Sequence, residues 1–257
     1  MMMTPKKISI VGSGNVASHL LVWIRDAGHI ISSVYARKQG SVSEEFNRRD
    51  TLDYKGEVVD YIIIATNDDS IEKIAGNLHN TSKAVILHTS GTVSVQTLDL
   101  PKFQGFGVLY PLQTLQKNRR ISLENVPFLI EASSESVLQN LEKFCESCKI
   151  TYKSVNSENR LMYHLSAVII SNFANHLFHI AEKNLSNNNL KFDILRPLIE
   201  ETIAKAFENG AFNSQTGPAK RGDSETMNKH LDLLKQENYK DIYKLISESI
   251  ILEYRSE

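Results

Sequence analysis

Small residues at three positions near the N-terminus are spaced as a dinucleotide site requires. Gly12, Gly14 and Ala17 form a Gly-x-Gly-x-x-Ala pattern that follows a short apolar strand and precedes a helical pattern. The first glycine allows a tight turn, the second lets a pyrophosphate approach the backbone, and the third small residue lets the helix pack closely on the strand. The helix N-terminus also presents free N–H groups to the phosphates. We predict that a dinucleotide is bound by Gly12, Ser13, Gly14, Asn15 and Val16.

Two basic residues, Arg37 and Lys38, follow the second predicted strand. About 20 residues past the glycine turn, a site that selects NAD usually has an acidic residue that binds the ribose hydroxyls. A guanidinium at this position instead suits a 2′-phosphate, which it can grip bidentately. We therefore predict that the cofactor is NADP (NADPH), contacted by Arg37 and Lys38. The alternative is a solvated basic loop.

Polar side chains also follow three later strands where each strand ends. Ligands of doubly wound sheets sit beyond the carboxyl ends of the strands. We therefore expect these groups to line the cofactor cleft and the place where nicotinamide and substrate meet, although each set could be only a capped turn. The predicted cofactor contacts are Thr66, Asn67, His88, Thr89 and Ser90, and the third set is Tyr110-Pro111-Leu112-Gln113-Thr114.

A long apolar helix further along the chain carries several polar side chains. At 100° per residue, Ser171 and Asn175 each lie within about 20° of His164, and Asn172 lies about 80° from His164. Buried polar groups need hydrogen-bond partners, and a substrate could be one. We predict His164 as proton donor, because its unperturbed pKa of about 6.5 suits proton exchange near neutrality. His88 is the second choice, and the alternative is a structural histidine.

A turn-rich loop, Thr216–Asp223, separates two helical patterns near the C-terminus. Lys220 and Arg221 could bind a substrate carboxylate, and Asp223 could order the loop or cap the next helix. The alternative is an exposed loop. Our predicted catalytic set is His164 or His88 as donor, Asn172 and Ser171 to orient a carbonyl, and Arg221 to hold a carboxylate.

Composition excludes several classes of protein. The 257 residues carry a formal net charge of −1, so there is no electrostatic reason to expect nucleic acid or an anionic membrane as a partner. No apolar run reaches the roughly 18 residues that a membrane-spanning helix needs. The N-terminus enters the first strand without an apolar signal core, so we expect a cytoplasmic protein.

Three other chemistries lack support in the sequence. Cys145 and Cys148 form a C-x-x-C pair, but they share one helical stripe with Leu138, Leu141 and Phe144, which favours burial in a core over redox activity. We expect no metal, because there is no H-E-x-x-H and the histidines lack ligand spacing. A serine hydrolase is not indicated, because there is no G-x-S-x-G elbow.

The elements that position these residues divide the chain in two. Residues 1–155 alternate strand and helix patterns, which predicts an α/β Rossmann domain with a doubly wound, mostly parallel sheet. Residues 156–257 predict an all-helical substrate and dimerisation domain with helices at Glu158–Leu185, Asp193–Asn209, Ser224–Lys235 and Tyr239–Tyr254. The first of these is apolar on most of its circumference, so we expect a second subunit to bury part of it. In the first domain we expect strands at Ile8–Val11, Ile30–Tyr35, Tyr61–Ala65, Ala84–His88, Gly105–Leu109, Pro127–Ile130 and Ile150–Val155, and helices at Val16–Ala27, Glu44–Arg48, Ile71–Leu78 and Ser136–Cys148.

Taken together, these motifs resemble an uncharacterised family of Rossmann-like proteins that carry a C-terminal helical domain of unknown function. That family is similar to pyrroline-5-carboxylate reductases, ketopantoate reductases and F420-dependent NADP oxidoreductases. The resemblance is carried, in order, by Gly12-Ser13-Gly14-Asn15-Val16-Ala17, His88-Thr89-Ser90-Gly91, Tyr110-Pro111-Leu112-Gln113-Thr114, Tyr163-His164 through Ser171-Asn172-Phe173, and Thr216-Gly217-Pro218 through Arg221-Gly222-Asp223.

The resemblance implies a C-terminal domain like that of 6-phosphogluconate dehydrogenase, and a homodimer whose helical domains complete each other's substrate clefts. The family more often has a histidine where this chain has Tyr110, so the chain departs from the family pattern there. The leading hypothesis is an NADPH-dependent reductase of a small carboxylated ketone or imine, with ketopantoate ahead of pyrroline-5-carboxylate on resemblance alone. The alternative is a non-catalytic NADP-binding sensor or scaffold dimer, because no obvious catalytic lysine is present.

Overall fold

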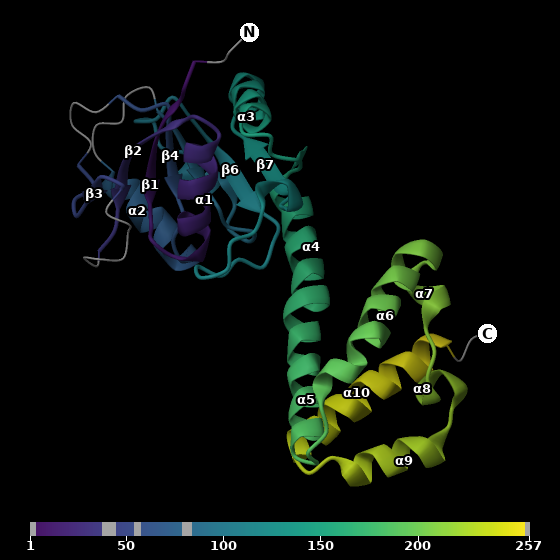
Figure 1. The fold of residues 1–257 in the computed structure, drawn as a ribbon. Coiled ribbons are helices and arrows are strands. Elements are labelled where there is room, and N and C mark those ends of the chain that lie inside the picture. The colour runs from purple at the N-terminus through teal and green to yellow at the C-terminus, as the bar shows by residue number, and fades with distance from the viewer. Residues whose placement is uncertain (1–3, 38–44, 54–57, 79–83, 255–257) are drawn as a thin grey trace. The chain divides into compact units, whose positions relative to one another are not determined.

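The computed structural model describes residues 4–37, 45–53, 58–78 and 84–254. It contains two compact units, Met1–Ser171 and Asn172–Glu257, drawn in Figure 1 from purple through teal to yellow along the chain. The first holds the sheet and its helices, whereas the described part of the second is helical.

The first unit is built on an eight-stranded sheet with the order β3-β2-β1-β4-β5-β6-β7-β8. Neighbouring strands are parallel, except that β6 and β7 are antiparallel. All seven predicted strands are confirmed, with ends that differ by at most two residues. The strands are β1 Lys7–Val11, β2 Ile30–Tyr35, β3 Arg48–Arg49, β4 Tyr61–Ile64, β5 Val85–His88, β6 Gly105–Pro111, β7 Phe128–Ala132 and β8 Tyr152–Ser154.

Helices cover both faces of this sheet because its central strands are apolar on both faces. Alternate residues of a strand point to opposite sides. On one side Ile10 and Ile63 share a core with α1 (Asn15–Asp26) and α3 (Glu135–Ser147). On the other side Ile62 packs in a core with α2 (Ile71–Asn77) and the 3₁₀ turn Val95–Leu98. The predicted doubly wound fold is confirmed.

One predicted helix of this unit is wrong. Glu44 of the expected helix Glu44–Arg48 lies outside the described residues, and Arg48 begins β3, in which Val34 pairs with Arg48 and Tyr35 with Arg49. A helix of five residues is only marginal without tertiary support. Pairing instead extends the sheet along the outer side of β2.

The connection between the antiparallel strands β6 and β7 runs along α1. Its short 3₁₀ turn spans Leu123–Asn125. The Nε2 atom of His19 lies 3.0 Å from the carbonyl oxygen of Arg119, and Nε1–H of Trp23 donates to the carbonyl oxygen of Ile121 at 3.1 Å. These bonds hold residues 119–121 beside the helix that begins at the glycine turn.

The two cysteines lie in the core, as predicted. Cys145 is fully buried on α3, Cys148 follows that helix, and neither forms a disulfide. Burial raises the pKa of the Cys145 thiol far above its ordinary value and that of Cys148 to about 12. Thiols held neutral in this way are poor nucleophiles.

The predicted long helix Glu158–Leu185 is present, with one change. It comprises α4 (Ser157–Ala167), a π-helical segment Val168–Phe173, and α5 (Ala174–Ser186). The i→i+5 turns of a π segment place more residues in each turn than an α-helix does. The predicted alignment of His164 with Ser171 and Asn175 assumed 100° per residue throughout, so this assumption fails from Val168 onward.

The second unit continues with further helices joined by short turns. The helices predicted at Asp193–Asn209, Ser224–Lys235 and Tyr239–Tyr254 are confirmed with shifted ends, and the loop Thr216–Asp223 contains a helical turn that was not predicted. Pro218 begins that turn, and Gly222 follows it with φ +69°. The elements are the 3₁₀ turn Phe192–Leu195, α6 Arg196–Asn209, α7 Ala211–Ser214, α8 Pro218–Arg221, α9 Ser224–Leu233 and α10 Glu237–Tyr254.

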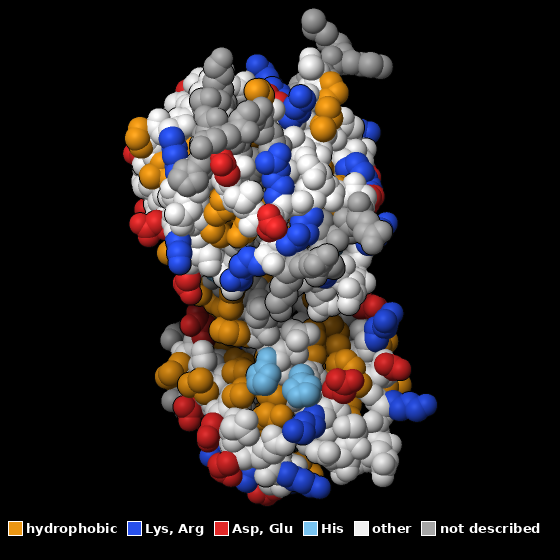
Figure 2. All heavy atoms as spheres, turned by 90° about the vertical axis from the view of Figure 1, so that its left-hand side faces the viewer, with side chains coloured by type: hydrophobic (Ala, Val, Ile, Leu, Met, Phe, Trp, Pro, Cys, Tyr) orange, Lys and Arg blue, Asp and Glu red, His pale blue; other side chains and the backbone are white. Residues whose placement is uncertain are grey.

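Many large apolar side chains of this unit are exposed, including Ile194, Leu198 and Phe207 along α6 and the segment before it. Figure 2 shows such side chains at the surface of this unit.

Every helix among the described residues is too short or too polar to span a membrane.

Candidate active site

The glycine turn has the geometry that its sequence predicts. Gly12 adopts φ +136° and its N–H donates to the carbonyl oxygen of Tyr35 at 2.9 Å. A Cβ on Gly12 would lie 2.1 Å from the carbonyl oxygen of Ala65, so only glycine fits there. Gly14 begins α1 without a side-chain cap, and a Cβ on it would meet nothing within 4 Å. The first glycine thus closes the turn, and the second leaves open space at the helix N-terminus, beside Ser13, Asn15 and Val16.

Two arginines lie near the carboxyl end of β2. Arg37 is exposed just beyond the strand, and Lys38 lies outside the described residues. Arg49 of β3 pairs with Tyr35, and its carbonyl oxygen accepts from N–H of Ala36 at 3.1 Å. Sequence reasoning missed Arg49 because it directly follows the segment Glu44–Arg48 that was assigned to a helix, although the pair Arg48-Arg49 was a visible basic signal.

The residues after β4 reach the turn after β5. Thr66 is half-buried and Asn67 is exposed, next to the 3₁₀ turn Asp68–Ser70. An oxygen of Asp68, Oδ2, accepts from Oγ1–H of Thr92 at 2.6 Å. The register of β4 and β5 brings their carboxyl ends together, with Ile64 opposite His88. The predicted cofactor groups Thr66 and Asn67 therefore lie at the same sheet edge as the turn 88–93.

The turn itself holds His88, Thr89 and Ser90 in internal bonds. His88 is fully buried, and its Nδ1 accepts from N–H of Ser90 at 3.1 Å. Burial, with a smaller effect of Arg160, lowers the pKa of His88 to about 4. The Ser90 hydroxyl oxygen accepts from N–H of Val93 at 3.0 Å, and N–H of Thr89 donates to the carbonyl oxygen of Ile64 at 3.2 Å. His88 is therefore a neutral side chain held inside the fold.

His164 pairs with Tyr110. The Tyr110 hydroxyl oxygen lies 2.9 Å from Nδ1 of His164, and the rings meet edge to face at 5.8 Å. Burial raises the pKa of the Tyr110 hydroxyl. Gly91 packs against both side chains. A Cβ at residue 91 would lie 2.6 Å from Nδ1 of His164 and 3.0 Å from Cζ of Tyr110, so a larger residue would clash with the pair. Tyr110, the residue at which the chain departs from the family pattern, is therefore the hydrogen-bond partner of His164, the predicted proton donor.

A buried ion pair joins the same elements and was not predicted. Arg160 is fully buried, and its Nη1 pairs with the carboxylate of Glu131. Its Nη2 donates to the carbonyl oxygen of Val93. The sequence signal was slight: a glutamate after an apolar run and an arginine early in a helical pattern, 29 residues apart.

The remaining predicted site residues fall in two places. Ser171 is half-buried in the π segment, whereas Asn172 and Arg221 are exposed and belong to the second unit. Asp223 caps α9, since its Oδ1 accepts from N–H of Thr226 at 3.0 Å. Capping the next helix was one of the two roles predicted for Asp223. Lys220 lies over the ring of Tyr254 at 4.7 Å.

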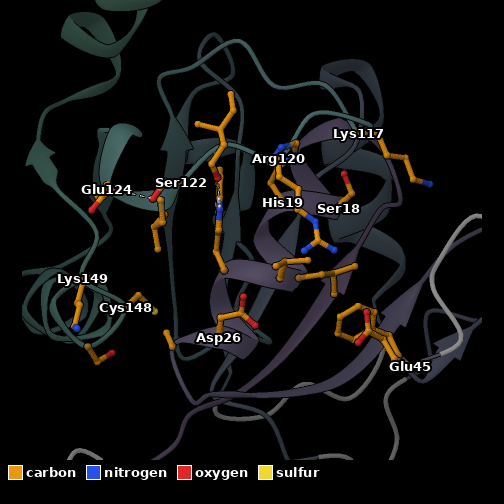
Figure 3. Close-up of a pocket in the computed structure, with 18 of the residues that line it drawn as sticks. Ser18, His19, Asp26, Glu45, Lys117, Arg120, Ser122, Glu124, Cys148 and Lys149 are labelled. Carbon is orange, nitrogen blue, oxygen red and sulfur yellow. Dashed lines mark hydrogen bonds between the residues drawn. The ribbon is translucent and has the colours of Figure 1, made fainter.

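A cavity of about 890 Å³ runs along the outer side of α1 (Figure 3). Ser13 and Lys117 line it near the glycine turn, and Asp26 and Cys148 line it near the other end of the helix. N–H of Lys117 donates to Oδ1 of Asn15 at 3.1 Å. Tyr110 and His164 do not line this cavity, so the cavity and the Tyr110–His164 pair are separate features of the unit.

Comparison with known proteins agrees with this geometry. Residues 126–250 match a family described as a domain of unknown function, DUF2520. The structure is similar to that of a "putative NADP oxidoreductase" from Bacteroides fragilis, with 30% identity and a TM-score of 0.88 over 96% of this chain and 98% of the other. No curated protein matches the sequence.

Two more distant structures share the fold. A Thermotoga maritima protein is 21% identical, with a TM-score of 0.69 over 97% of this chain and 98% of the other. The Plasmodium falciparum pyrroline carboxylate reductase, solved with NADP bound, is 12% identical, with a TM-score of 0.60 over 99% of both chains.

Proposed function

Because this chain belongs to the family of NADP oxidoreductase-like Rossmann proteins that carry the DUF2520 domain, we propose that it is an NADPH-dependent reductase of a small carboxylated ketone or imine. The observation that carries the proposal is the hydrogen-bonded pair of Tyr110 and His164, packed against Gly91 beyond the carboxyl end of β5. A proton donor beside the nicotinamide position is what such a reduction requires of the protein.

The glycine turn fits the cofactor. The open space at Gly14 and the uncapped N-terminus of α1 leave room and N–H donors for a pyrophosphate. Arg37, which follows the strand that pairs with Arg49, supplies a guanidinium for a 2′-phosphate, and Thr66 and Asn67 line the same sheet edge. When bound, NADPH supplies the hydride; the chain must bind and orient both partners and supply one proton.

The proton is held by His164. As an imidazolium, His164 donates Nδ1–H to the Tyr110 hydroxyl oxygen, which leaves Nε2–H to protonate the substrate. Once Nε2 has lost its proton, the neutral ring keeps the bond either by retaining Nδ1–H or by accepting the Tyr110 O–H at Nδ1, because a phenol both donates and accepts. The raised pKa of Tyr110 keeps that hydroxyl protonated during the cycle. His88, buried and neutral, instead orders the turn.

We assign the substrate-binding roles to residues of the long helix and of α8. Ser171 and Asn172 would orient the carbonyl or imine, and Arg221 would hold the carboxylate. We propose that the protein acts as a homodimer, because Leu161 and Ile170 expose large apolar side chains on that helix. Ketopantoate-like substrates rank ahead of pyrroline-5-carboxylate-like ones.

The test is turnover of NADPH with a panel of 2-oxo acids and cyclic imines, followed by absorbance. The wild type should consume NADPH with at least one member, and His164→Gln should lower kcat by roughly 10²–10⁴, the usual range for a general acid. Binding of NADPH should persist in the variant.

Two other outcomes have distinct meanings. NADPH binding without turnover across the panel would favour the non-catalytic sensor or scaffold. Normal turnover in a destabilised His164→Gln would make His164 a structural residue and leave the donor unassigned.

A further inference from the structure

The buried guanidinium of Arg160 joins three elements of the first unit. It pairs with Oε2 of Glu131 on β7, donates to the carbonyl oxygen of Val93 in the turn after β5, and lies 3.2 Å from Oγ of Ser157 at the start of α4. Ser157 completes the network, since its N–H and its hydroxyl donate to the Glu131 carboxylate at 3.0 and 2.8 Å. N–H of Val95 donates to the Ser157 hydroxyl oxygen at 3.2 Å.

Two of these three elements carry a part of the Tyr110–His164 site, and the third, β7, pairs with β6, the strand that carries Tyr110. His164 lies four residues after Arg160 on α4, which places both on one side of the helix. Val93 lies two residues after Gly91, the glycine that contacts the pair. Glu131 stands opposite Val108 of β6, two residues before Tyr110 and on the same face of that strand.

We propose that Arg160 is a positioning residue for proton transfer, and that the Arg160–Glu131 pair sets the distance between His164, Tyr110 and the turn at Gly91. The inference rests on the proposed reductase function of that site. A guanidinium is needed because its rigid fork satisfies the carboxylate and the Val93 carbonyl at once, whereas a lysine ammonium is a single point donor.

The first test is Arg160→Lys, which keeps the charge and loses the fork. We expect NADPH affinity to stay within about twofold, because the glycine turn is untouched, and kcat per folded molecule to fall roughly tenfold to a hundredfold, as small misplacements of reacting groups do. Glu131→Gln should lower kcat in the same way. Arg25→Lys is the matched control: Arg25 is half-buried on α1 and pairs with Asp26 and Glu45, and this variant should keep wild-type kcat.

The decisive measurement is a double-mutant cycle with His164→Gln. If Arg160 acts through His164, the double variant should have the kcat of His164→Gln within about twofold, because the effects of coupled residues do not add. Multiplicative losses, or an unchanged kcat per folded molecule in Arg160→Lys, would overturn the proposal and leave Arg160 with a role in stability alone.

A second readout separates this proposal from the proposed function. Nitrogen NMR of histidine-labelled protein reports the bond at Nδ1 of His164 without any substrate. We expect that resonance to move in Arg160→Lys and to stay in place in Arg25→Lys. If the wild type turns over nothing on the panel, the reductase proposal fails, but an unmoved Nδ1 resonance is what would overturn the positioning role.

Discussion

At the scale of single residues, two histidines near the same sheet edge differ in burial and in hydrogen bonding, and so suit different roles. His88 is fully buried with a pKa lowered to about 4, whereas His164 is only partly buried and bonds to a phenol. The sequence alone does not rank them, since His88 directly follows an apolar run and His164 lies between Tyr163 and Leu165. Burial and hydrogen bonding therefore decide which histidine can exchange a proton.

The depressed pKa of His88 predicts a dependence of stability on pH. The unfolded chain binds a proton at His88 below about pH 6.5, but the folded chain does so only near pH 4. The contribution of His88 to the free energy of unfolding is therefore fully present above pH 6.5. It is lost as the pH falls toward 4, and the loss is about 2 kcal/mol at pH 5. Urea denaturation of wild type and His88→Asn at pH 7.5 and 5 measures this. Asparagine can still accept from Ser90, so the variant should lose less stability on acidification; equal losses would contradict the assignment.

Arg37 predicts the choice of cofactor. A charged hydrogen bond contributes enough for Arg37→Ala to weaken NADPH binding about ten- to a hundredfold and to leave NADH binding nearly unchanged. Fluorescence titration with both cofactors checks this. Arg49→Ala should show the same direction if both guanidinium groups face the 2′-phosphate, whereas equal losses for NADPH and NADH would contradict the predicted selectivity.

At the scale of elements, the helix that carries Arg160 and His164 begins at a polar cap. Oδ1 of Asn156 accepts from N–H of Asn159 at 2.8 Å. Asn156→Ala should lower the free energy of unfolding by about 1 kcal/mol, and Asn156→Gly by only a few tenths. Denaturant unfolding of both variants measures the difference. An Ala variant as stable as wild type would show that this cap contributes nothing.

Much of this level was predictable from the sequence. The strands Ile30–Tyr35 and Tyr61–Ile64 and the helix Ile71–Asn77 follow directly from apolar runs and their period. Local pattern could not predict β3, because an edge strand of two residues depends on the free side of β2. Nor could it predict the π segment at Val168–Phe173, which changes phase inside an otherwise regular apolar helix.

The site divides in the same way. Motifs identified the glycine turn, the polar strand ends and His164, because each is a local signal. The bond from Tyr110 to His164 and the pair of Arg160 with Glu131 join residues 54 and 29 positions apart. Such contacts depend on the strand order and register, which no single segment specifies.

At the scale of the whole molecule, the exposed apolar surface predicts self-association. Phe207 is 87% exposed and Ile194 78% exposed, and patches of this kind usually mark interfaces. Light scattering at micromolar concentration should give twice the 29.0 kDa of one chain. Phe207→Glu should shift the mass toward that of one chain, whereas Lys229→Glu, on an exposed part of α9, should not. A stable wild-type monomer would contradict the predicted dimer.

The indole of Trp23 gives this molecule an optical property of its own. It is the single tryptophan of the chain, buried on α1, with its N–H fixed by the carbonyl oxygen of Ile121. Nine residues of helix separate it from Gly14, about 14 Å along the axis. Tryptophan emission overlaps the absorption band of reduced nicotinamide, which the oxidised form lacks. The emission of this single indole should therefore fall when the reduced cofactor occupies the glycine turn and recover when that cofactor is oxidised.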